Sequence, residues 1–245
     1  MNDLLKNISI VLVQTKTSSN IGAAARAMNC MGLSDLILAE PRCQIDKNAF
    51  SLASGSEHIL ENSRIYYDLK EALQDFSLVV GTTRRQGKKR HNFITPRQLS
   101  SEIFPMYSNI KAAILFGSED YGLSLEHFKE CQYLVYIPVS ENFGSLNLAQ
   151  AVMVITYELR ASLEAGKHKK SITDIASQEE LAILSKVFAD TFEKVRFPNK
   201  QNSVNPASKL MEICARANLS KYEVKLLLSF ARHADYMSGK SEVIL

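Results

Sequence analysis

The segment GSLNLAQAVMVITYE, from Gly144 to Glu158, is the stretch of this sequence that decides the fold. Its second half predicts a helix with one broad buried face, because apolar residues recur there at helical spacing. The residues of that face are Ala149, Val152, Met153, Ile155, Thr156 and Leu159. The first half is different, since Ser145 and Asn147 stand at the start of this apolar helix, directly after the irregular run SENFG. Polar side chains at a helix start either cap the helix or face a ligand.

The composition is that of an ordinary globular protein. The chain has 245 residues, of which 46% are hydrophobic and 22% charged, so it is large enough for a substantial core. The formal net charge of +3 means that any nucleic-acid surface must come from local clustering. The N-terminus lacks a signal-peptide pattern, and no apolar run approaches the roughly 18 residues that cross a bilayer. We therefore expect a cytoplasmic protein that makes no contact with a membrane.

Metal sites and disulfides are not expected. Four cysteines are scattered without CxxC spacing, which predicts free and mostly buried thiols. The five histidines are dispersed, and HExxH does not occur. GxGxxG, GxxxxGK[ST] and GxSxG are also missing, which disfavours a dinucleotide fold, a P-loop NTPase and serine hydrolysis.

Short β-branched runs alternate with helical patterns through about residue 165. The predicted strands are 8–14, 35–40, 64–68, 77–83, 111–118 and 133–139. A helix over 20–31, ended by Gly32, follows the first strand. Continuously apolar strands are typical of a parallel sheet covered on both faces. The sequence therefore predicts an α/β domain with about six parallel strands.

The composition changes at the charged run EAGKHKKSITD, residues 164–174. We predict an α/β domain over 1–165, a linker over 166–176 and a small helical domain over 177–245. Ser177 with Glu180, and Ser220 with Glu223, form helix-starting capping boxes in the helical part.

Three polar, glycine-containing segments lie at or after the carboxyl ends of predicted strands. They are SSNIGAAARA (18–27), LFGSEDYGLS (115–124) and IPVSENFGSLNLAQAV (137–152). Open α/β sheets bind ligands at this edge, so the three segments predict one shared crevice. Each segment alone is explained by ordinary turns, and it is their combination that favours a ligand site.

A basic run follows the predicted strand 77–83. RRQGKKRH, residues 84–91, supplies five candidate RNA-binding residues, Arg84, Arg85, Lys88, Lys89 and Arg90. A solvated charge run is an equally good interpretation of this stretch alone. Residues 186–232 also carry nine Lys or Arg against four Asp or Glu, which suits RNA binding, although this helical part could instead stabilise a dimer.

The segments NIGAAAR, FGSEDYGLS and IP…SLNLAQAV resemble the three motifs of the SPOUT methyltransferases, in their TrmH-like branch. Their order and the helical tail are most similar to the TrmJ-type tRNA 2′-O-methyltransferases, which act on the anticodon loop. The resemblance covers essentially the whole chain and is strongest over 1–160. It implies a SPOUT-type parallel-sheet domain with a deep C-terminal trefoil knot, S-adenosyl-L-methionine as cofactor, no metal, and a homodimer.

The resemblance also implies site residues. The cofactor-binding set is Thr82, Thr83, Arg84, Gly117, Ile137, Gly144, Ser145 and Leu146. The catalytic set is Arg26, Asn20, Glu119, Ser145 and Asn147. Arg26 would bind the phosphate beside the target ribose and stabilise the developing alkoxide, since a guanidinium keeps its proton. Asn20 and Glu119 would orient Arg26 or the nucleotide. Without the motif, Arg26 would be interpreted as a surface residue.

The predicted function is S-adenosylmethionine-dependent 2′-O-methylation of a ribose in the tRNA anticodon loop, with cytidine or uridine at position 32 as the expected target. Alternatives are methylation of ribosomal RNA, methylation of a base, and a noncatalytic RNA-binding assembly factor. The sequence leaves open the preference between cytidine and uridine, the set of tRNAs, and the group that accepts the proton. It also leaves open whether Arg26 acts in its own subunit or across the dimer.

Overall fold

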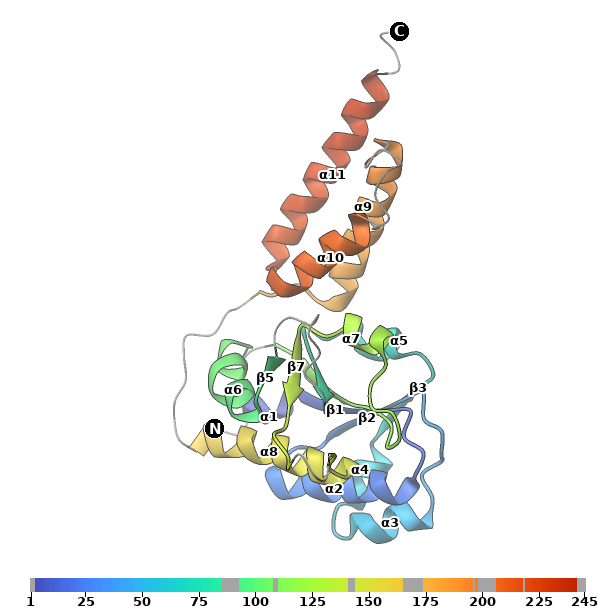
Figure 1. The fold of residues 1–245 in the computed structure, drawn as a ribbon, viewed down its shortest axis with the longest axis vertical. Coiled ribbons are helices and arrows are strands. Elements are labelled where there is room, and N and C mark those ends of the chain that lie inside the picture. The colour runs from blue at the N-terminus through green and yellow to red at the C-terminus, as the bar shows by residue number, and fades with distance from the viewer. Residues whose placement is uncertain are drawn as a thin grey trace. The chain divides into compact units, whose positions relative to one another are not determined.

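The structure is a computed structural model in which the chain divides into two compact units, residues 1–172 and 173–245 (Figure 1). It describes residues 3–84, 93–107, 110–140, 144–164, 174–195, 197, 206–217 and 219–241.

The first unit is built on a seven-stranded sheet in which every pairing between described strands is parallel. The strands are β1 Ile8–Val13, β2 Asp35–Ala39, β3 Arg64–Tyr66, β4 Leu78–Thr83, β5 Phe93–Ile94, β6 Ala112–Phe116 and β7 Tyr133–Tyr136. The predicted parallel sheet and its six strands are confirmed. The seventh strand, β5, has only two residues and extends the sheet beyond β7.

The strand order β3-β2-β1-β6-β4-β7-β5 places β6 between β1 and β4. Val11 of β1 is in register with Ile37 of β2 on one side and with Leu115 of β6 on the other. Strands β2 and β3 therefore lie on one side of β1, and the later strands β4 to β7 lie on its other side. In such sheets the carboxyl ends of the strands form a crevice where the order reverses.

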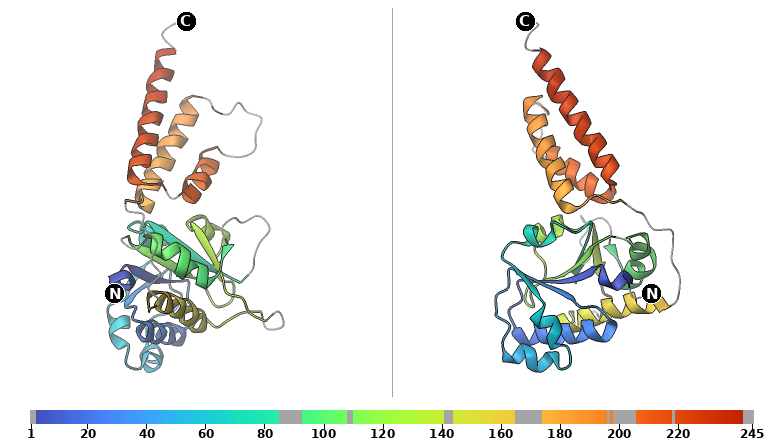
Figure 2. Two further views of the ribbon diagram at one scale, coloured as in Figure 1. Left: turned by 90° about the vertical axis from the view of Figure 1, so that its left-hand side faces the viewer. Right: turned by 180° about the vertical axis from the view of Figure 1, so that it is seen from behind.

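Helices cover both faces of this sheet. They are α1 Asp3–Lys6, α2 Ser18–Met31, α3 Lys47–Ala53, α4 Glu57–Glu61, α5 Leu69–Leu73, α6 Pro96–Gln98, α7 Leu125–Lys129 and α8 Leu148–Glu164, with a π-helical turn η1 Leu99–Ile103 and a 3-10 turn η2 Phe104–Tyr107. Helix α2 packs against α8 and α3, and Figures 1 and 2 show these helices together below the sheet.

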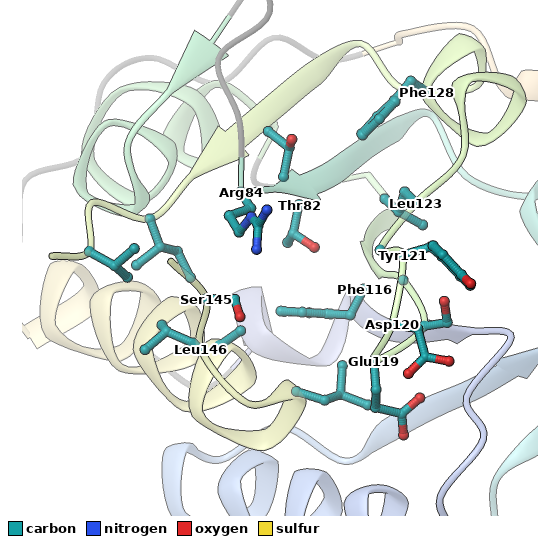
Figure 3. Close-up of a pocket in the computed structure, with 18 residues that line it drawn as sticks. Thr82, Arg84, Phe116, Glu119, Asp120, Tyr121, Leu123, Phe128, Ser145 and Leu146 are labelled. Atoms are coloured by element: carbon teal, nitrogen blue, oxygen red, sulfur yellow. The ribbon is translucent and has the colours of Figure 1, made fainter. Parts of the chain in front are cut away.

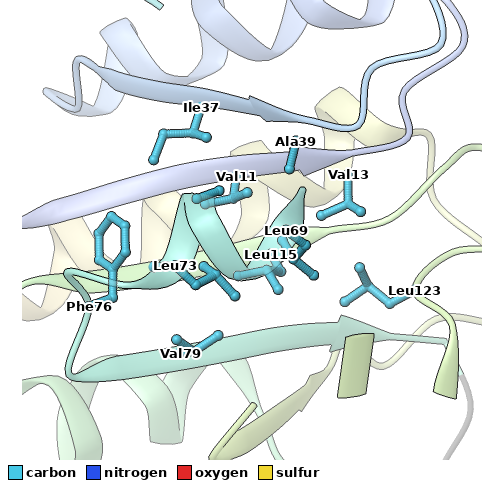
Figure 4. Close-up of a cluster of buried hydrophobic side chains, with 12 residues drawn as sticks. Val11, Val13, Ile37, Ala39, Leu69, Leu73, Phe76, Val79, Leu115 and Leu123 are labelled. Carbon is cyan, nitrogen blue, oxygen red and sulfur yellow. The ribbon is translucent and has the colours of Figure 1, made fainter. Parts of the chain in front are cut away.

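One layer of the core lies between the sheet and α5 (Figure 4). Its side chains alternate along the strands, as the two-residue period requires. The cluster comprises Val11, Val13, Ile37, Ala39, Leu69, Ala72, Leu73, Phe76, Val79, Ala113, Leu115 and Leu123. Each of its large side chains contributes about 1.5–3 kcal/mol through removal from water. This packing fixes the strands whose ends form the site.

The helix ends follow local chemistry. Gly32 ends α2 in the left-handed conformation, with φ of 81°, as predicted. Helix α2 begins at Ser18, two residues earlier than predicted.

The cysteines are free, but the prediction that most are buried is wrong, because Cys30 is exposed, Cys43 and Cys131 are partly buried, and Cys214 alone is buried.

The second unit consists of α9 Gln178–Lys194, α10 Pro206–Ala217 and α11 Lys221–Ser241. The predicted capping boxes of Ser177 and Ser220 are both present. Its core comprises Ala176, Leu181, Leu184, Phe188, Cys214, Val224 and Ala231. Residues 166–173 of the predicted linker lie outside the described residues, and Ile175 and Ala176 are buried in this second unit. The trefoil knot stays a prediction of the resemblance.

Candidate active site at the carboxyl edge of the sheet

A cavity of about 460 Å³ lies at the carboxyl ends of β4, β6 and β7 (Figure 3). The end of β4 and the loops that follow β6 and β7 form its walls, and the start of α8 contributes to them. Its lining comprises Thr82, Thr83, Arg84, Phe116, Gly117, Ser118, Glu119, Asp120, Tyr121, Gly122, Leu123, Phe128, Ile137, Val139, Ser145, Leu146, Leu148 and Ala151. The second and third glycine-containing segments therefore meet at one cavity, whereas no residue of the first segment, 18–27, lines it, so the predicted crevice shared by all three is found for two of them.

Seven of the eight residues predicted to bind a cofactor line this cavity, and Gly144 is the exception. Gly144 nevertheless adjoins it, because a Cβ atom built there would lie 3.7 Å from Nη1 of Arg84. Gly144 has a φ of 82°, which favours glycine and turns the chain into the loop before α8. Figure 3 shows Arg84 directed into the cavity, near Thr82 and opposite Ser145.

The loop from Gly117 to Gly122 is tightly folded. A Cβ atom on Gly117 would lie 2.0 Å from the carbonyl carbon of Gly122, so only glycine fits there. The Gly122 N–H donates to the Ser118 carbonyl oxygen at 2.8 Å, and Gly122 has a φ of 69°. These two glycines therefore fix the shape of the loop that holds the residues between them at the cavity mouth.

A hydrogen-bond chain joins all three glycine-containing segments. Asn147 Nδ2 donates to Asn20 Oδ1 at 3.1 Å, and Asn20 Nδ2 donates to Glu119 Oε1 at 2.8 Å. The two bonds link residues 127 and 99 positions apart. Asn20 does not line the cavity, but it connects the side chains that flank it. We name Asn20, Glu119 and Asn147 the polar network.

Glu119 is held by the backbone as well as by Asn20. The N–H groups of Lys16 and Thr17, directly before α2, donate to its carboxylate at 3.1 and 3.2 Å. Partial burial raises the pKa of Glu119, but the hydrogen bonds from Asn20 and from backbone N–H groups outweigh it and lower that pKa overall. The positive end of α2 also favours a negative charge at this place. Glu119 is therefore an ionised, oriented carboxylate at neutral pH.

Asn147 explains the polar start of α8. Its Oδ1 accepts from the Ala149 N–H at 2.8 Å, and its own N–H donates to Gln150 Oε1 at 3.0 Å. Asn147 is thus the cap of α8 and a member of the polar network at once. Ser145 does not cap the helix, because α8 begins at Leu148 and Gly144 to Leu146 belong to the loop before it. Ser145 is exposed in that loop and lines the cavity.

Arg26 is exposed on α2 and lies outside the cavity lining. It is six residues beyond Asn20 on the same helix, which places it about 9 Å further along the axis and about 240° around it. The structure therefore brings Asn20, Glu119, Ser145 and Asn147 together, but it does not bring Arg26 to the cavity of its own subunit.

Of the predicted RNA-binding residues, Arg84 lines the cavity, while Arg85, Lys88, Lys89 and Arg90 lie outside the described residues. Sequence interpretation missed Asp120 and Tyr121, which line the cavity mouth, and their neighbour Lys16. Lys16 pairs with Asp120, and its Nζ lies 5.6 Å from the centre of the Tyr121 ring. Their positions in the loops that follow β1 and β6 could have indicated this, since both strands end at the ligand-binding edge.

The described part of the chain offers neither a metal centre nor a membrane span. It contains no group of three or more His, Cys, Asp or Glu residues placed to hold a metal ion. Within the same residues, no helix combines the length and the apolar character that crossing a bilayer requires.

The family described as SpoU rRNA Methylase matches residues 7–157, which is more than half of the chain. The chain belongs to the SpoU rRNA Methylase family. This confirms the resemblance to SPOUT methyltransferases of the TrmH-like branch. All lining residues of the cavity and the whole polar network fall within the residues that match the SpoU family, whereas the second unit falls outside them.

Several relatives of this SpoU family member are similar over nearly their whole length. A Haemophilus influenzae protein named as an uncharacterized tRNA/rRNA methyltransferase is 34% identical over 229 residues, which cover 91% of this chain and 92% of the relative. The Pseudomonas aeruginosa tRNA (cytidine/uridine/adenosine-2′-O-)-methyltransferase TrmJ is 34% identical over 236 residues, with the same shares. The crystal structure of TrmJ from Z. mobilis ZM4 superposes with a TM-score of 0.77 at 30% identity, covering 92% of this chain and 97% of that one. The predicted SPOUT-type fold is therefore confirmed.

Proposed function

We propose that this protein transfers a methyl group from S-adenosyl-L-methionine to the 2′-hydroxyl of a ribose in tRNA. The observation that carries the proposal is the cavity at the carboxyl edge, flanked by a polar network that joins three distant segments. Membership of a methylase family supports the reaction class. The names of the TrmJ relatives, as tRNA 2′-O-methyltransferases, support tRNA ribose as the substrate.

The residues around the cavity fit this cofactor. A volume of about 460 Å³ falls within the range of about 300–1,000 Å³ that small-molecule sites occupy. Phe116 and Ile137 provide apolar surface for a nucleoside base, while Thr82 and Ser145 provide hydroxyls and Arg84 provides a cation for a carboxylate. We assign cofactor binding to Thr82–Arg84, Gly117, Ile137 and Gly144–Leu146. When bound, S-adenosylmethionine supplies a sulfonium methyl group that is electrophilic without a metal.

The protein's own task is then to place the ribose and to stabilise the alkoxide that forms on it. Asn20, Glu119 and Asn147 hold one another in fixed orientation, so they present a rigid polar surface beside the cavity. Alignment of two reactants accounts for up to about 7–11 kcal/mol of a barrier in well-oriented systems. Ser145, in the loop that lines the cavity, contributes a hydroxyl next to this surface.

Arg26 supplies positive charge in this proposal. Its guanidinium binds the phosphate beside the target ribose and stabilises the alkoxide, and the RNA phosphate or a water accepts the proton. Because Arg26 is exposed and does not line its own subunit's cavity, we infer that it serves the site of a second copy in a homodimer.

The anticodon loop, position 32, and cytidine or uridine there are the substrate that the sequence resemblance favours. Arg84 and the basic run that follows it would hold the phosphate backbone, together with the basic stretch 186–232 of the second unit. The P. aeruginosa relative is named for adenosine as well as for both pyrimidines, so that protein tolerates different bases.

The test uses the purified full chain, labelled S-adenosylmethionine and an unmodified tRNA transcript, with nucleoside mass spectrometry as the readout. We expect 2′-O-methylcytidine or 2′-O-methyluridine at one anticodon-loop position. Label in ribosomal RNA and in no tRNA would contradict the substrate. Binding of the cofactor without label in any RNA would contradict the enzyme activity and favour an RNA-binding factor.

A further inference from the structure

Tyr121 is an unusual feature of the cavity mouth. Its side chain is 87% exposed although it belongs to the residues that line the cavity. Figure 3 shows its ring on the outer side of the loop, directed away from Ser145 and Arg84. The ring therefore does not wall off the interior of the cavity, where the cofactor is proposed to lie. The ring faces the solvent outside the cavity mouth.

The loop that carries Tyr121 is pinned at both ends. Gly117 and Gly122 pack backbone against backbone, and Glu119 is fixed by the N–H groups that precede α2. Glu119 and Tyr121 are two residues apart, so their Cα atoms lie within about 7 Å of each other. The Tyr121 ring is therefore carried on the same short loop as Glu119, a member of the polar network.

Lys16 supports the ring from one side. Its Nζ lies 5.6 Å from the ring centre, within the range of a cation–π contact. Lys16 also pairs with Asp120, and the hydrogen bond and charge of that carboxylate raise the pKa of Lys16. The lysine is therefore charged at neutral pH and held against the ring. Since 87% of the tyrosine stays exposed, the rest of the ring is open to a ligand.

We propose that Tyr121 is a stacking platform for a base of the RNA strand next to the methylated ribose, steadied by Lys16 and Asp120. This inference rests on the proposed function and adds a substrate-binding residue to it. RNA loops present unstacked bases, and proteins hold such bases on exposed aromatic rings. Stacking does not depend on hydrogen bonds to base edges, so the platform accepts pyrimidines and purines alike.

The first experiment compares Tyr121→Ala, Tyr121→Phe and Tyr67→Ala in the full chain. Tyr67 is the matched control, because it is 84% exposed in the same unit, follows β3, and is not part of the cavity lining. Affinity for tRNA is measured by filter binding, and affinity for S-adenosylmethionine by calorimetry. We expect Tyr121→Ala to weaken tRNA binding about 5- to 100-fold, as loss of one stacked base does. Tyr121→Phe and Tyr67→Ala should bind as wild type does, and all three should bind the cofactor normally.

The second experiment identifies the base. Full-length tRNAs that carry one abasic nucleotide at successive anticodon-loop positions are bound to wild type and to Tyr121→Ala. At one position the abasic change should weaken wild-type binding and leave Tyr121→Ala unaffected, because the partner of that base is already gone.

Three results would overturn the inference: normal tRNA affinity of Tyr121→Ala, loss of its cofactor affinity, or no position that couples to the ring. Failure of the proposed function looks different, since wild type would then methylate no tRNA, whatever the tRNA affinity of Tyr121→Ala. The binding comparison still decides the role of Tyr121 in that case.

Discussion

Different kinds of side-chain contact stabilise the cavity edge of the first unit and the helices of the second unit. At the cavity edge, side chains meet that are 99 to 127 residues apart, as in the bonds from Asn20 to Glu119 and from Asn147 to Asn20. In the described part of the second unit, Ser177 and Ser220 cap helices through bonds to residues three positions away, and Lys194 donates to Asp235, 41 positions away. Long-range polar contacts fix a reaction centre before a substrate arrives, whereas local ones only define helix ends.

The second unit instead exposes aromatic, apolar and basic side chains on α11. Tyr222, Leu226 and Phe230 are exposed at four-residue spacing on α11, which places them on one side of the helix. Lys225 and Arg232 are exposed on the same helix. Aromatic and basic side chains together are typical of surfaces that bind single-stranded nucleic acid. We therefore expect the chemistry in the first unit and substrate binding in both.

The largest expected effect comes from Arg26→Ala. We expect the rate of methyl transfer to fall by about 10³-fold, as it does when a group that stabilises an oxyanion is removed. Cofactor affinity, measured by calorimetry, should not change, because Arg26 is exposed outside the cavity lining. Arg26→Lys, which keeps the charge but not the planar fork, is the matched control and should recover part of the rate. Undiminished turnover of Arg26→Ala would remove this residue from the mechanism.

Mixing two inactive variants sharpens the same prediction. Arg26→Ala and Asn147→Ala are combined under conditions that let subunits exchange, and methyl transfer is then measured. If Arg26 serves the partner's cavity, one of the two sites in each mixed dimer is complete. Because about half of the dimers are mixed after exchange of equal amounts, about a quarter of wild-type activity should return. Activity that stays at the level of the separate variants would place Arg26 in its own subunit.

Glu119→Gln removes the negative charge from the polar network and keeps the size of the side chain. We expect methyl transfer to slow by about 10²-fold, because Asn20 and the N–H groups before α2 lose a charged acceptor. The pKa of Glu119 is lowered in the folded protein, so its stabilising effect is present at neutral pH and is lost as the pH falls below its ordinary value. Urea unfolding should show the variant less stable than wild type at pH 7, with the difference narrowing on acidification. Glu61→Gln, an exposed change at the end of α4, is the control, and a pH-independent difference for Glu119→Gln would contradict this account.

The smallest effect is expected in the second unit, from the double change Lys225→Gln and Arg232→Gln. It should weaken tRNA binding and lower the slope of log affinity against log salt by about 0.7–0.9 for each phosphate that the protein no longer neutralises. Cofactor affinity should stay at the wild-type value. A salt dependence identical to that of wild type would show that this helix does not bind the RNA backbone.

Sequence patterns predicted the parallel sheet because its strands are continuously apolar. A run such as that within 111–118 indicates a strand buried on both faces. They did not predict β5, since two residues carry no periodicity and pair only because β7 lies beside them. Asn147 was predicted at the site through a motif. Its bond to Asn20 depends on how the whole unit folds, so no local pattern contains it. Tyr121 and Lys16 were missed for the same reason, because their contact spans two loops that the sheet brings together.

Titration of S-adenosylmethionine into wild type, Ala151→Phe and Ala217→Phe tests the central claim most directly. Ala151 lines the cavity from α8, so a phenyl ring there occupies the proposed cofactor site, whereas Ala217 is exposed on α10 in the second unit. We expect wild type and Ala217→Phe to bind equally, and Ala151→Phe to bind at least about tenfold more weakly, because the cofactor must be enclosed in that space. Equal affinity of all three proteins would show that the cavity at the carboxyl edge is not the cofactor site.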